Sequence, residues 1–209
     1  NDYNIEAIKS GTNWGMKETT LQAQAIETRR GVNVVGAVNA SFFNMANGQP
    51  IGALVMNGEV IATSGAESTF WIDSEGAAHI SGSDFRVTEE MGVKEAVGGS
   101  TILVRNGEVV YPANTSEGTN PRTAVGIKAD GTVVFYEVDG RQAPYSTGMN
   151  LYDLALMIKD LGCVDAMNLD GGGSSTFATQ REGEENENGR AGLTLRNSPS
   201  DGYERTVSS

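Results

Sequence analysis

Four segments of the chain carry the pattern of a β-hairpin, with strand-forming residues on both sides of a short run of turn residues. The pairs Asn57-Gly58 and Asn106-Gly107 are the strongest of these signals, because a two-residue type I′ turn needs positive φ at both central positions. Much of the middle of the chain is therefore expected to be antiparallel sheet. The four segments are residues 53–62 (ALVMNGEVIA), 70–80 (FWIDSEGAAHI), 102–111 (ILVRNGEVVY) and 124–138 (AVGIKADGTVVFYEV).

Two segments have the pattern of a helix. Residues 17–30 place Leu21, Ala25 and Thr28 on one side and end at Gly31. The second segment, residues 150–161, has the clearer pattern. Its apolar residues follow helical spacing at Leu151, Leu154, Ala155, Ile158 and Leu161, with Asn150 as the candidate N-cap and Gly162 after the last turn.

The remaining segments complete an α+β fold: a hairpin-rich mixed sheet with about two main helices and one β-helix-β crossover. We expect buried strands at residues 34–38 and 164–169, and a mobile surface loop at the polar, acidic residues 181–190. A length of 209 residues suits one domain, so we expect residues 1–209 to form a single domain.

Charge and composition exclude several classes of function. The formal net charge of -12 argues against a nucleic-acid partner, and no apolar run approaches the ~18 residues of a membrane span, so no membrane insertion is expected. The one cysteine, Cys163, cannot form an internal disulfide and is expected to be a small buried hydrophobe. The one histidine, His79, lies in a predicted hairpin strand, which argues against a Ser-His-Asp triad or a multi-histidine metal site.

Three short motifs are expected to meet at one edge of the sheet. The hairpin of residues 124–138 is antiparallel, so Arg122 should lie opposite Val138 and beside Asp139. The following crossover through the second helix should set the next strand parallel, which brings Asp170 to the same edge as Asp139. Ligands of such sheets bind outside the carboxyl ends of the strands.

The stretch NLDGGGSSTF supplies groups that suit an anionic ligand. Glycines can expose successive backbone N–H groups with no Cβ in the way, and serines add hydroxyl donors. Arg122 and Arg141 can each bind a phosphate through two N–H groups. We therefore expect a pocket for a phosphorylated or sugar-phosphate ligand, whose loop consists of Asp170, Gly171, Gly172, Gly173, Ser174 and Ser175.

The alternative is that the three glycines only turn the chain, while the arginines form structural ion pairs with Asp139 and Asp170. The glycines alone favour this alternative, but the convergence of three motifs favours a binding site. The loop lacks the Gly-Lys-Ser/Thr ending of a P-loop and the last glycine of a nucleophile elbow. Carboxylates could hold a divalent cation such as Ca²⁺ or Mg²⁺, but no ligand spacing demands one, so we expect no required cofactor.

Asn39 is a further candidate, because it follows the predicted strand of residues 34–38. Its amide could form a hydrogen bond with a sugar hydroxyl or amide, or it could cap a turn, and the sequence favours neither. Phe42 and Phe43 come next and fit the core better than an aromatic wall of the pocket.

Together these motifs resemble the phosphodiester glycosidase family. The resemblance covers most of the chain, from about residue 21 to residue 207. It implies hydrolysis of a sugar-1-phosphodiester, such as a GlcNAc-1-phosphodiester, and an extracellular or cell-surface location. One matching stretch is VNASFF at residues 38–43. Its last five residues, NASFF, stand where many members carry NGGFF, and this departure bears on the substrate more than on the chemistry. The other matching stretches are PRTAVGI, DGRQ followed by STGMNLYDLA, AMNLDGGGSSTF and SDGYERTV.

A mechanism follows as a hypothesis. Cleavage of the sugar C1–O bond releases a phosphomonoester, whose second pKa of ≈ 6 makes it a far better leaving group than an alcohol. Arg122, with Arg141 or the glycine amides, would bind the departing phosphate, and Thr123 and Asn39 would add substrate contacts. Asp170 would activate water or attack the anomeric carbon, with Asp139 as the competing candidate.

Two other functions fit the same motifs. One is a non-catalytic surface module that binds a phosphorylated or otherwise anionic glycan. The other is a phosphodiesterase that breaks the P–O bond instead of the C–O bond. In each case the partner is a sugar-phosphodiester or phosphorylated glycan.

Overall fold

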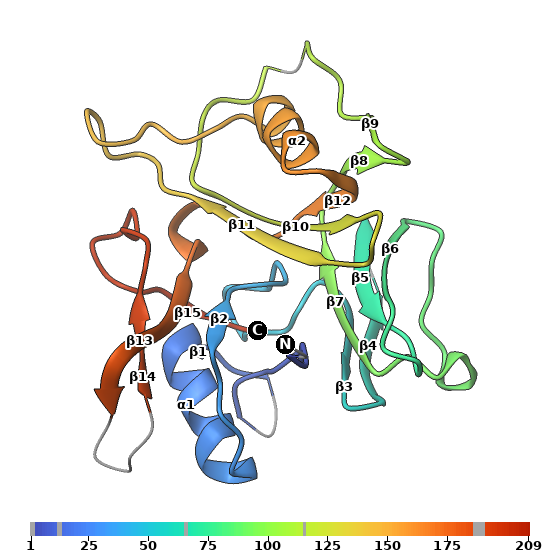
Figure 1. Cartoon of the computed structure of the whole chain (residues 1–209), viewed down its shortest axis with the longest axis vertical. Helices are drawn as coiled ribbons and strands as arrows, with labels where there is room; N and C mark the ends of the chain where they lie inside the picture. Colours follow the sequence, from blue (N-terminus) through green and yellow to red (C-terminus); the bar gives the residue numbers. More distant parts are fainter. Residues whose placement is uncertain (1–2, 12–13, 65–66, 115, 186–190) are drawn as a thin grey trace.

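The computed structural model describes residues 3–11, 14–64, 67–114, 116–185 and 191–209. A central five-stranded sheet has the order β11-β10-β12-β8-β9, and a second five-stranded sheet has the order β4-β3-β7-β5-β6 (Figure 1). The central strands are β8 (Ile102–Arg105), β9 (Glu108–Val109), β10 (Arg122–Lys128), β11 (Val133–Val138) and β12 (Cys163–Asn168). The second sheet contains β3 (Gly52–Met56), β4 (Glu59–Ser64), β5 (Ser68–Ile72), β6 (Ala78–Gly82) and β7 (Glu95–Gly99).

Two smaller sheets and two helices complete the α+β fold. A three-stranded sheet has the order β14-β13-β2, and a two-stranded sheet pairs β1 with β15. Short 3₁₀ turns occur at η1 (Glu89–Met91) and η2 (Gly172–Ser174). The other elements are β1 (Lys17–Glu18), α1 (Thr19–Arg30), β2 (Gly36–Val38), α2 (Leu151–Asp160), β13 (Phe177–Glu185), β14 (Ala191–Leu195) and β15 (Thr206–Val207).

All four predicted hairpins are present, as the antiparallel pairs β3–β4, β5–β6, β8–β9 and β10–β11. At the first turn Asn57 has φ 50° and Gly58 φ 81°, and at the third Asn106 has φ 52° and Gly107 φ 78°. The positive φ values at both positions are those that a type I′ turn requires. The sequence signal and the backbone therefore agree at the level of single residues.

The β-helix-β crossover is also present. Strand β10 is antiparallel to both β11 and β12, so β11 and β12 run parallel to each other with β10 between them. The helix α2 begins at Asn150, whose side chain accepts a hydrogen bond from the backbone N of Asp153 at 2.8 Å. Gly162 follows the helix with φ 90°. Both carboxyl ends of the parallel strands consequently lie at one edge of the sheet.

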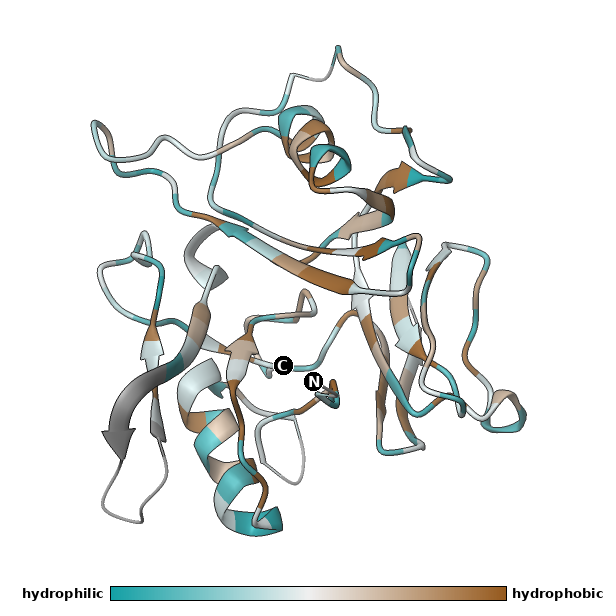
Figure 2. Cartoon of the chain, in the orientation of Figure 1, coloured by the Kyte–Doolittle hydropathy of each residue, from teal (hydrophilic) through white to brown (hydrophobic). Residues whose placement is uncertain are grey.

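The central sheet has a hydrophobic core on each face (Figures 1 and 2). On one face, α2 packs through Leu154 and Ile158 against Val104 and Ala124. Alternate residues of the same strands point to the other face, where they pack against the second five-stranded sheet. That second cluster contains Leu54, Phe70, Ile72, Ile80, Val97, Val125, Ile127, Met167 and Leu169. Burying each such side chain contributes about 1.5–3 kcal/mol, so these two cores fix the edge at which the strands end.

The structure corrects the predicted face of α1. Leu21 and Thr28 are exposed, whereas Gln22 and Glu27 are buried with Ala23 and Ile26. The polar residues bond main-chain groups: Gln22 Nε2 donates to Val207 O at 2.9 Å, and Glu27 accepts from the backbone N of Val34 at 3.0 Å. These partners come from distant segments, and they override a weak apolar pattern. The helix does end at Gly31, in the left-handed conformation.

Two other predictions for the chain were wrong in part. The predicted buried strand at residues 34–38 is the shorter strand β2, which is an edge strand with half-exposed or exposed residues. The predicted loop begins as strand, because β13 continues to Glu185 and pairs with β14 at Ala191. Backbone pairing within the hairpin accommodates the polar residues there. Residues 186–190 of the predicted loop lie outside the described residues.

Candidate functional site

Three chain segments meet at the edge of the central sheet where β11 and β12 end and β10 begins. Arg122 pairs with Val138, and Ala124 pairs with Asn168. Beyond the strands, the backbone N of Leu169 donates to Thr123 O at 2.9 Å, and that of Gly172 donates to Pro121 O at 2.9 Å. The predicted convergence of the PRTAVG, DGRQ and LDGGGSS motifs is therefore present in the structure.

The glycine loop fits this edge because it lacks side chains. A Cβ on Gly171 would stand 2.8 Å from Pro121 O, and Gly172 has φ 63°. At Gly173 a Cβ would meet the guanidinium of Arg205 and the carboxylate of Asp201. The loop passes between backbone on one side and charged side chains on the other, and only glycine leaves room for both.

The loop does not present the expected row of backbone N–H groups. Gly171 N donates to Asp170 Oδ1, and Gly172 N donates to Pro121 O. Ser174 N and Ser175 N donate back into the loop, which forms the 3₁₀ turn η2. Both serine side chains are buried as well. Since a tight 3₁₀ turn uses these amides internally, arginine side chains must supply most of the donors for an anion.

The guanidinium groups of Arg141 and Arg205 lie against the loop, and Arg122 lies near Arg141 at the same edge of the sheet. Arg122 is half-buried, and its Nε donates to Met149 O at 3.0 Å and its Nη2 to Gly118 O at 3.4 Å. Burial lowers its pKa, Glu117 and Tyr111 oppose this effect, and the charge of Arg141 adds to it. Arg141 places Nη1 3.1 Å from where a Gly172 Cβ would be, with Nε and Nη2 held by Asn120 Oδ1. Arg205 lies over Gly173. Such a cluster of like charges favours an anionic ligand.

Asp170 lies at the base of the loop and is only partly exposed. Its backbone N donates to Ala40 O at 2.9 Å, which fixes its position. Burial raises the pKa of its carboxyl to about 6, against the opposing effects of Ser174, the Gly171 amide and the charge of Arg205. A carboxyl with such a pKa is ionised at neutral pH yet poorly solvated, which suits a nucleophile or general base.

Asn39 and Thr123 lie beneath the loop, and both are fully buried. Asn39 Nδ2 donates to Asp170 O at 2.7 Å, and its Oδ1 accepts from Thr123 Oγ1 at 2.9 Å and Thr176 N at 3.0 Å. These bonds tie the two ends of the glycine loop to strand β10. Of the two uses considered for Asn39, the geometry supports bonding within the protein, since its amide is closed off from solvent.

The second candidate carboxylate, Asp139, is occupied by neighbouring groups. Its oxygens accept from Ser198 N at 2.8 and 2.9 Å, from Asn197 Nδ2 at 3.3 Å and from Tyr145 Oη at 2.8 Å. It anchors the segment that follows β14 against the end of β11. These four bonds leave it less lone-pair capacity for chemistry than Asp170 has.

Residues outside the predicted set also reach this site. Arg205 and Asp201 form an ion pair at 2.7 Å, and both belong to the SDGYERTV motif. The sequence did not indicate that this motif lies against the glycine loop. Asn197 donates to Ser175 O at 2.9 Å. Glu137 lies opposite Thr123 in the β10–β11 register, and strand alternation next to Asp139 was the signal that could have identified it.

Within the described residues, no group of three or more His, Cys, Asp or Glu side chains could hold a metal ion. None of the helices that the structure describes combines the length and hydrophobicity that a membrane span needs. Cys163 is buried in the core beside α2, and burial raises its thiol pKa.

Comparison with known proteins identifies relatives of this chain. The model of a family described as phosphodiester glycosidase matches residues 32–209. The N-acetylglucosamine-1-phosphodiester alpha-N-acetylglucosaminidase of Homo sapiens is 29% identical over 179 residues, which cover 75% of this chain and 34% of that protein. Its counterpart from Bos taurus is 30% identical over 177 residues, covering 75% and 33%. The chain thus spans about a third of the length of these relatives.

A solved structure shares the fold. It is the zebrafish N-acetylglucosamine-1-phosphodiester alpha-N-acetylglucosaminidase catalytic domain, auto-inhibited by its pro-peptide. The two structures superpose with a TM-score of 0.73 at 23% sequence identity, covering 97% of this chain and 70% of the zebrafish chain.

Proposed function

Because the chain belongs to the phosphodiester glycosidase family, we propose that it hydrolyses a sugar-1-phosphodiester at the glycosidic C–O bond. One observation carries this proposal: the guanidinium groups of Arg141 and Arg205 lie against a glycine loop that begins with a partly exposed, ionisable aspartate, and Arg122 lies at the same edge of the sheet. The substrate class has a phosphate for the arginines and an anomeric carbon for the aspartate. The names of the human and bovine relatives make N-acetylglucosamine the first sugar to test.

Phosphate binding falls to Arg122 and Arg141, with Arg205 on the other side of the loop. Arg122 and Arg141 are close enough to interact electrostatically, and Glu117 and Tyr111 have larger, opposite effects on the pKa of Arg122. Negative charge grows on the phosphate oxygen as the C1–O bond breaks, and guanidinium groups that are already in position stabilise it without reorganisation. The released phosphomonoester is a good leaving group, so little help from a general acid is needed.

Asp170 is the proposed nucleophile or general base. It must be ionised for either role, and with a pKa of about 6 it is ionised at neutral pH. In the first role it attacks the anomeric carbon and water then hydrolyses the glycosyl ester; in the second it removes a proton from the attacking water. Asn39 and Thr123 are positioning residues, because they hold the loop and are fully buried beneath it.

The serines and glycines of the loop shape the proposed phosphate site, but they do not offer the phosphate a full set of backbone amides. Gly171, Gly172 and Gly173 let Pro121, Arg141 and Arg205 approach the backbone closely. A hydrogen bond from Ser174 lowers the pKa of Asp170, which favours the ionised form of the carboxyl at neutral pH. We propose that residues 1–209 form one domain and that the protein acts at an extracellular or cell-surface location, which fractionation of the source cells would test.

The test is a panel of sugar-1-phosphodiesters, led by methyl N-acetylglucosamine 1-phosphate, with and without EDTA. Release of free sugar and a phosphomonoester, abolished in Asp170→Asn, is the expected result. Binding without product would indicate a glycan-binding module instead. Loss of activity with EDTA, restored by Ca²⁺ or Mg²⁺, would overturn the expectation that no cofactor is required.

A further inference from the structure

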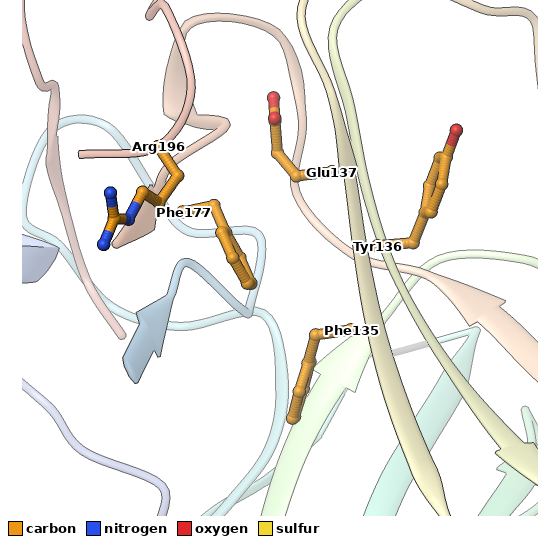
Figure 3. Close-up of a pocket in the computed structure, with 5 residues that line it drawn as sticks. All are labelled: Phe135, Tyr136, Glu137, Phe177 and Arg196. Atoms are coloured by element: carbon orange, nitrogen blue, oxygen red, sulfur yellow. The ribbon is translucent and has the colours of Figure 1, made fainter. Parts of the chain in front are cut away.

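A cavity of about 280 Å³ lies between β11 and β13, beside the glycine loop. It is lined by Phe135, Tyr136, Glu137, Phe177 and Arg196. Figure 3 shows that the side chains of Phe135 and Glu137 point to the face of β11 turned toward Phe177, whereas Tyr136 points to the opposite face. The open space is therefore bounded by two phenyl rings and a carboxyl group, with Arg196 at one side.

The cavity is joined to the catalytic loop through Asn197. Its Nδ2 reaches Ser175 O at 2.9 Å and Glu137 Oε1 at 3.4 Å, and its Oδ1 accepts from Phe177 N at 2.9 Å. Phe177 follows Ser175 by two residues in the chain. A substrate whose phosphate lies at the loop would thus place its next group in or beside this cavity.

The lining does not suit a second phosphate. Two of the guanidinium nitrogens of Arg196 are taken by protein oxygens: Nε donates to Thr179 Oγ1 at 2.5 Å and Nη2 to Gln180 O at 2.7 Å. Phe135 and Phe177 offer half-buried apolar ring surface. Small-ligand pockets are usually apolar with a few polar groups that fix orientation, and a volume near the low end of their range fits a single sugar ring.

Glu137 supplies the orienting polar group. Burial, with a contribution from the charge of Asp139, raises its pKa to about 8. Asp139 and Tyr145 are the titratable groups near it, and the guanidinium of Arg196 points away from it, toward Thr179 and Gln180 (Figure 3). At neutral pH the carboxyl is therefore protonated, and a protonated carboxyl donates one hydrogen bond. An acid in this state complements a carbonyl or hydroxyl oxygen of an uncharged sugar.

We propose that this cavity binds the sugar ring of the substrate, with Phe135 and Phe177 against its apolar surface and Glu137 donating a hydrogen bond to a sugar oxygen. The inference rests on the proposed function, and it names the residues that select the sugar. The acetamido group of an N-acetylated pyranose matches this lining best, because its methyl suits the rings and its carbonyl oxygen accepts from the acid.

Steady-state kinetics on methyl N-acetylglucosamine 1-phosphate separates the role of Glu137 from a structural one. Glu137→Gln keeps a neutral donor and should leave KM near the wild-type value at pH 7, while Glu137→Ala should raise KM at least ~10-fold with a smaller change in kcat. Between pH 7 and pH 9 the wild-type KM should rise as the acid ionises, and that of Glu137→Gln should stay flat. Glu59→Ala, an exposed glutamate on β4, is the matched control.

Three results would overturn the inference. The first is a KM within twofold of wild type in both Glu137→Ala and Phe177→Ala, and the second is a KM of Glu137→Gln as high as that of Glu137→Ala. The third is the same pH dependence of KM in the wild type and in Glu137→Gln. If the wild-type protein shows no hydrolysis, the proposed function fails, but the cavity is still testable. Saturation-transfer NMR with free N-acetylglucosamine should then show binding that Phe177→Ala abolishes. No binding to the wild type in that experiment would refute the sugar site.

Discussion

Arg205 lies against Gly173, so closely that a Cβ on the glycine would stand 2.0 Å from Nη2 of the arginine and 2.5 Å from Oδ2 of Asp201. The bare glycine backbone thus allows the Arg205–Asp201 ion pair to close over the loop. Arg205 also lowers the pKa of Asp170. The missing side chain at Gly173 therefore influences the ionisation of the proposed catalytic group through the position of Arg205.

Gly173→Ala should fold normally and lose activity. The new methyl meets the movable end of Arg205 rather than backbone, so we expect a thermal midpoint within a few degrees of wild type and kcat/KM at least ~10-fold lower. Gly192→Ala is the control, because a Cβ there meets nothing within 4 Å. Equal activity of the two variants would show that the position of Arg205 does not matter for turnover.

Arg122→Ala should lower kcat/KM by at least ~100-fold, because it removes a half-buried guanidinium from the proposed phosphate site. Arg122→Lys should recover only part of the loss, since an ammonium group cannot donate in the same paired geometry. Circular dichroism and the unfolding midpoint check that the fold is intact. A lysine variant with wild-type activity would mean that a point charge is enough.

The pH dependence should reveal Asp170. Its pKa is raised from 3.8 to about 6, so its reactive anion forms as the pH rises through about 6. We therefore expect kcat/KM to fall on the acid side with an apparent pKa near 6, measured from pH 4.5 to 8 at constant ionic strength. An acid limb near pH 4 would indicate a solvated carboxylate as the catalytic group.

Asp170→Asn should make the protein more stable while it loses activity. The raised pKa means that the folded state binds the proton more tightly than the unfolded state, so wild-type stability falls as pH rises from about 4 to about 6. Replacing the carboxylate by a neutral amide removes this cost, which is up to ~3 kcal/mol at pH 8 for a pKa that is raised from 3.8 to about 6. Denaturant unfolding at pH 8 and pH 4 measures it, with a gain expected only at pH 8. A variant less stable than wild type at pH 8 would contradict the burial argument.

Asn39→Ala should destabilise the fold. The amide is 0% exposed and forms three hydrogen bonds that hold the loop to β10, and leaving such buried partners unsatisfied costs about 1–3 kcal/mol each. We expect a loss of at least about 3 kcal/mol in the free energy of unfolding, measured in urea, together with reduced activity. Asn39→Asp keeps the acceptor for Thr123 and Thr176 but loses the donor to Asp170 O. Its free energy of unfolding should therefore be lower than that of the wild type. Wild-type stability in Asn39→Ala would refute the connecting role.

Local patterns predicted the elements that local chemistry determines. Asn57-Gly58 and Asn106-Gly107 dictate their turns because few other pairs adopt positive φ at both positions, and Asn150 and Gly162 mark the ends of α2 by capping. The face of α1 was not predictable in this way. It is set by backbone groups near residues 34 and 207, which the local sequence does not specify.

The site was predictable up to the topology and no further. Strand register placed Arg122 beside Val138, and the crossover placed Asp170 at the same edge. The use of the loop amides within a 3₁₀ turn depends on contacts with Pro121, and the approach of Arg205 depends on how the chain returns after β14. Both are set by packing between segments far apart in sequence, so a one-dimensional pattern carries little information about them.

The central claim, that Arg122 and Asp170 form one site that breaks a sugar C–O bond, is tested most directly by isotope position. Methyl N-acetylglucosamine 1-phosphate is hydrolysed in oxygen-18 water by the wild-type protein, with Asp170→Asn and Arg122→Ala in parallel, and the products are analysed by mass spectrometry. We expect label in the sugar and at least ~100-fold less product from both variants. Label in the phosphomonoester, or product from the variants at the wild-type rate, would contradict it.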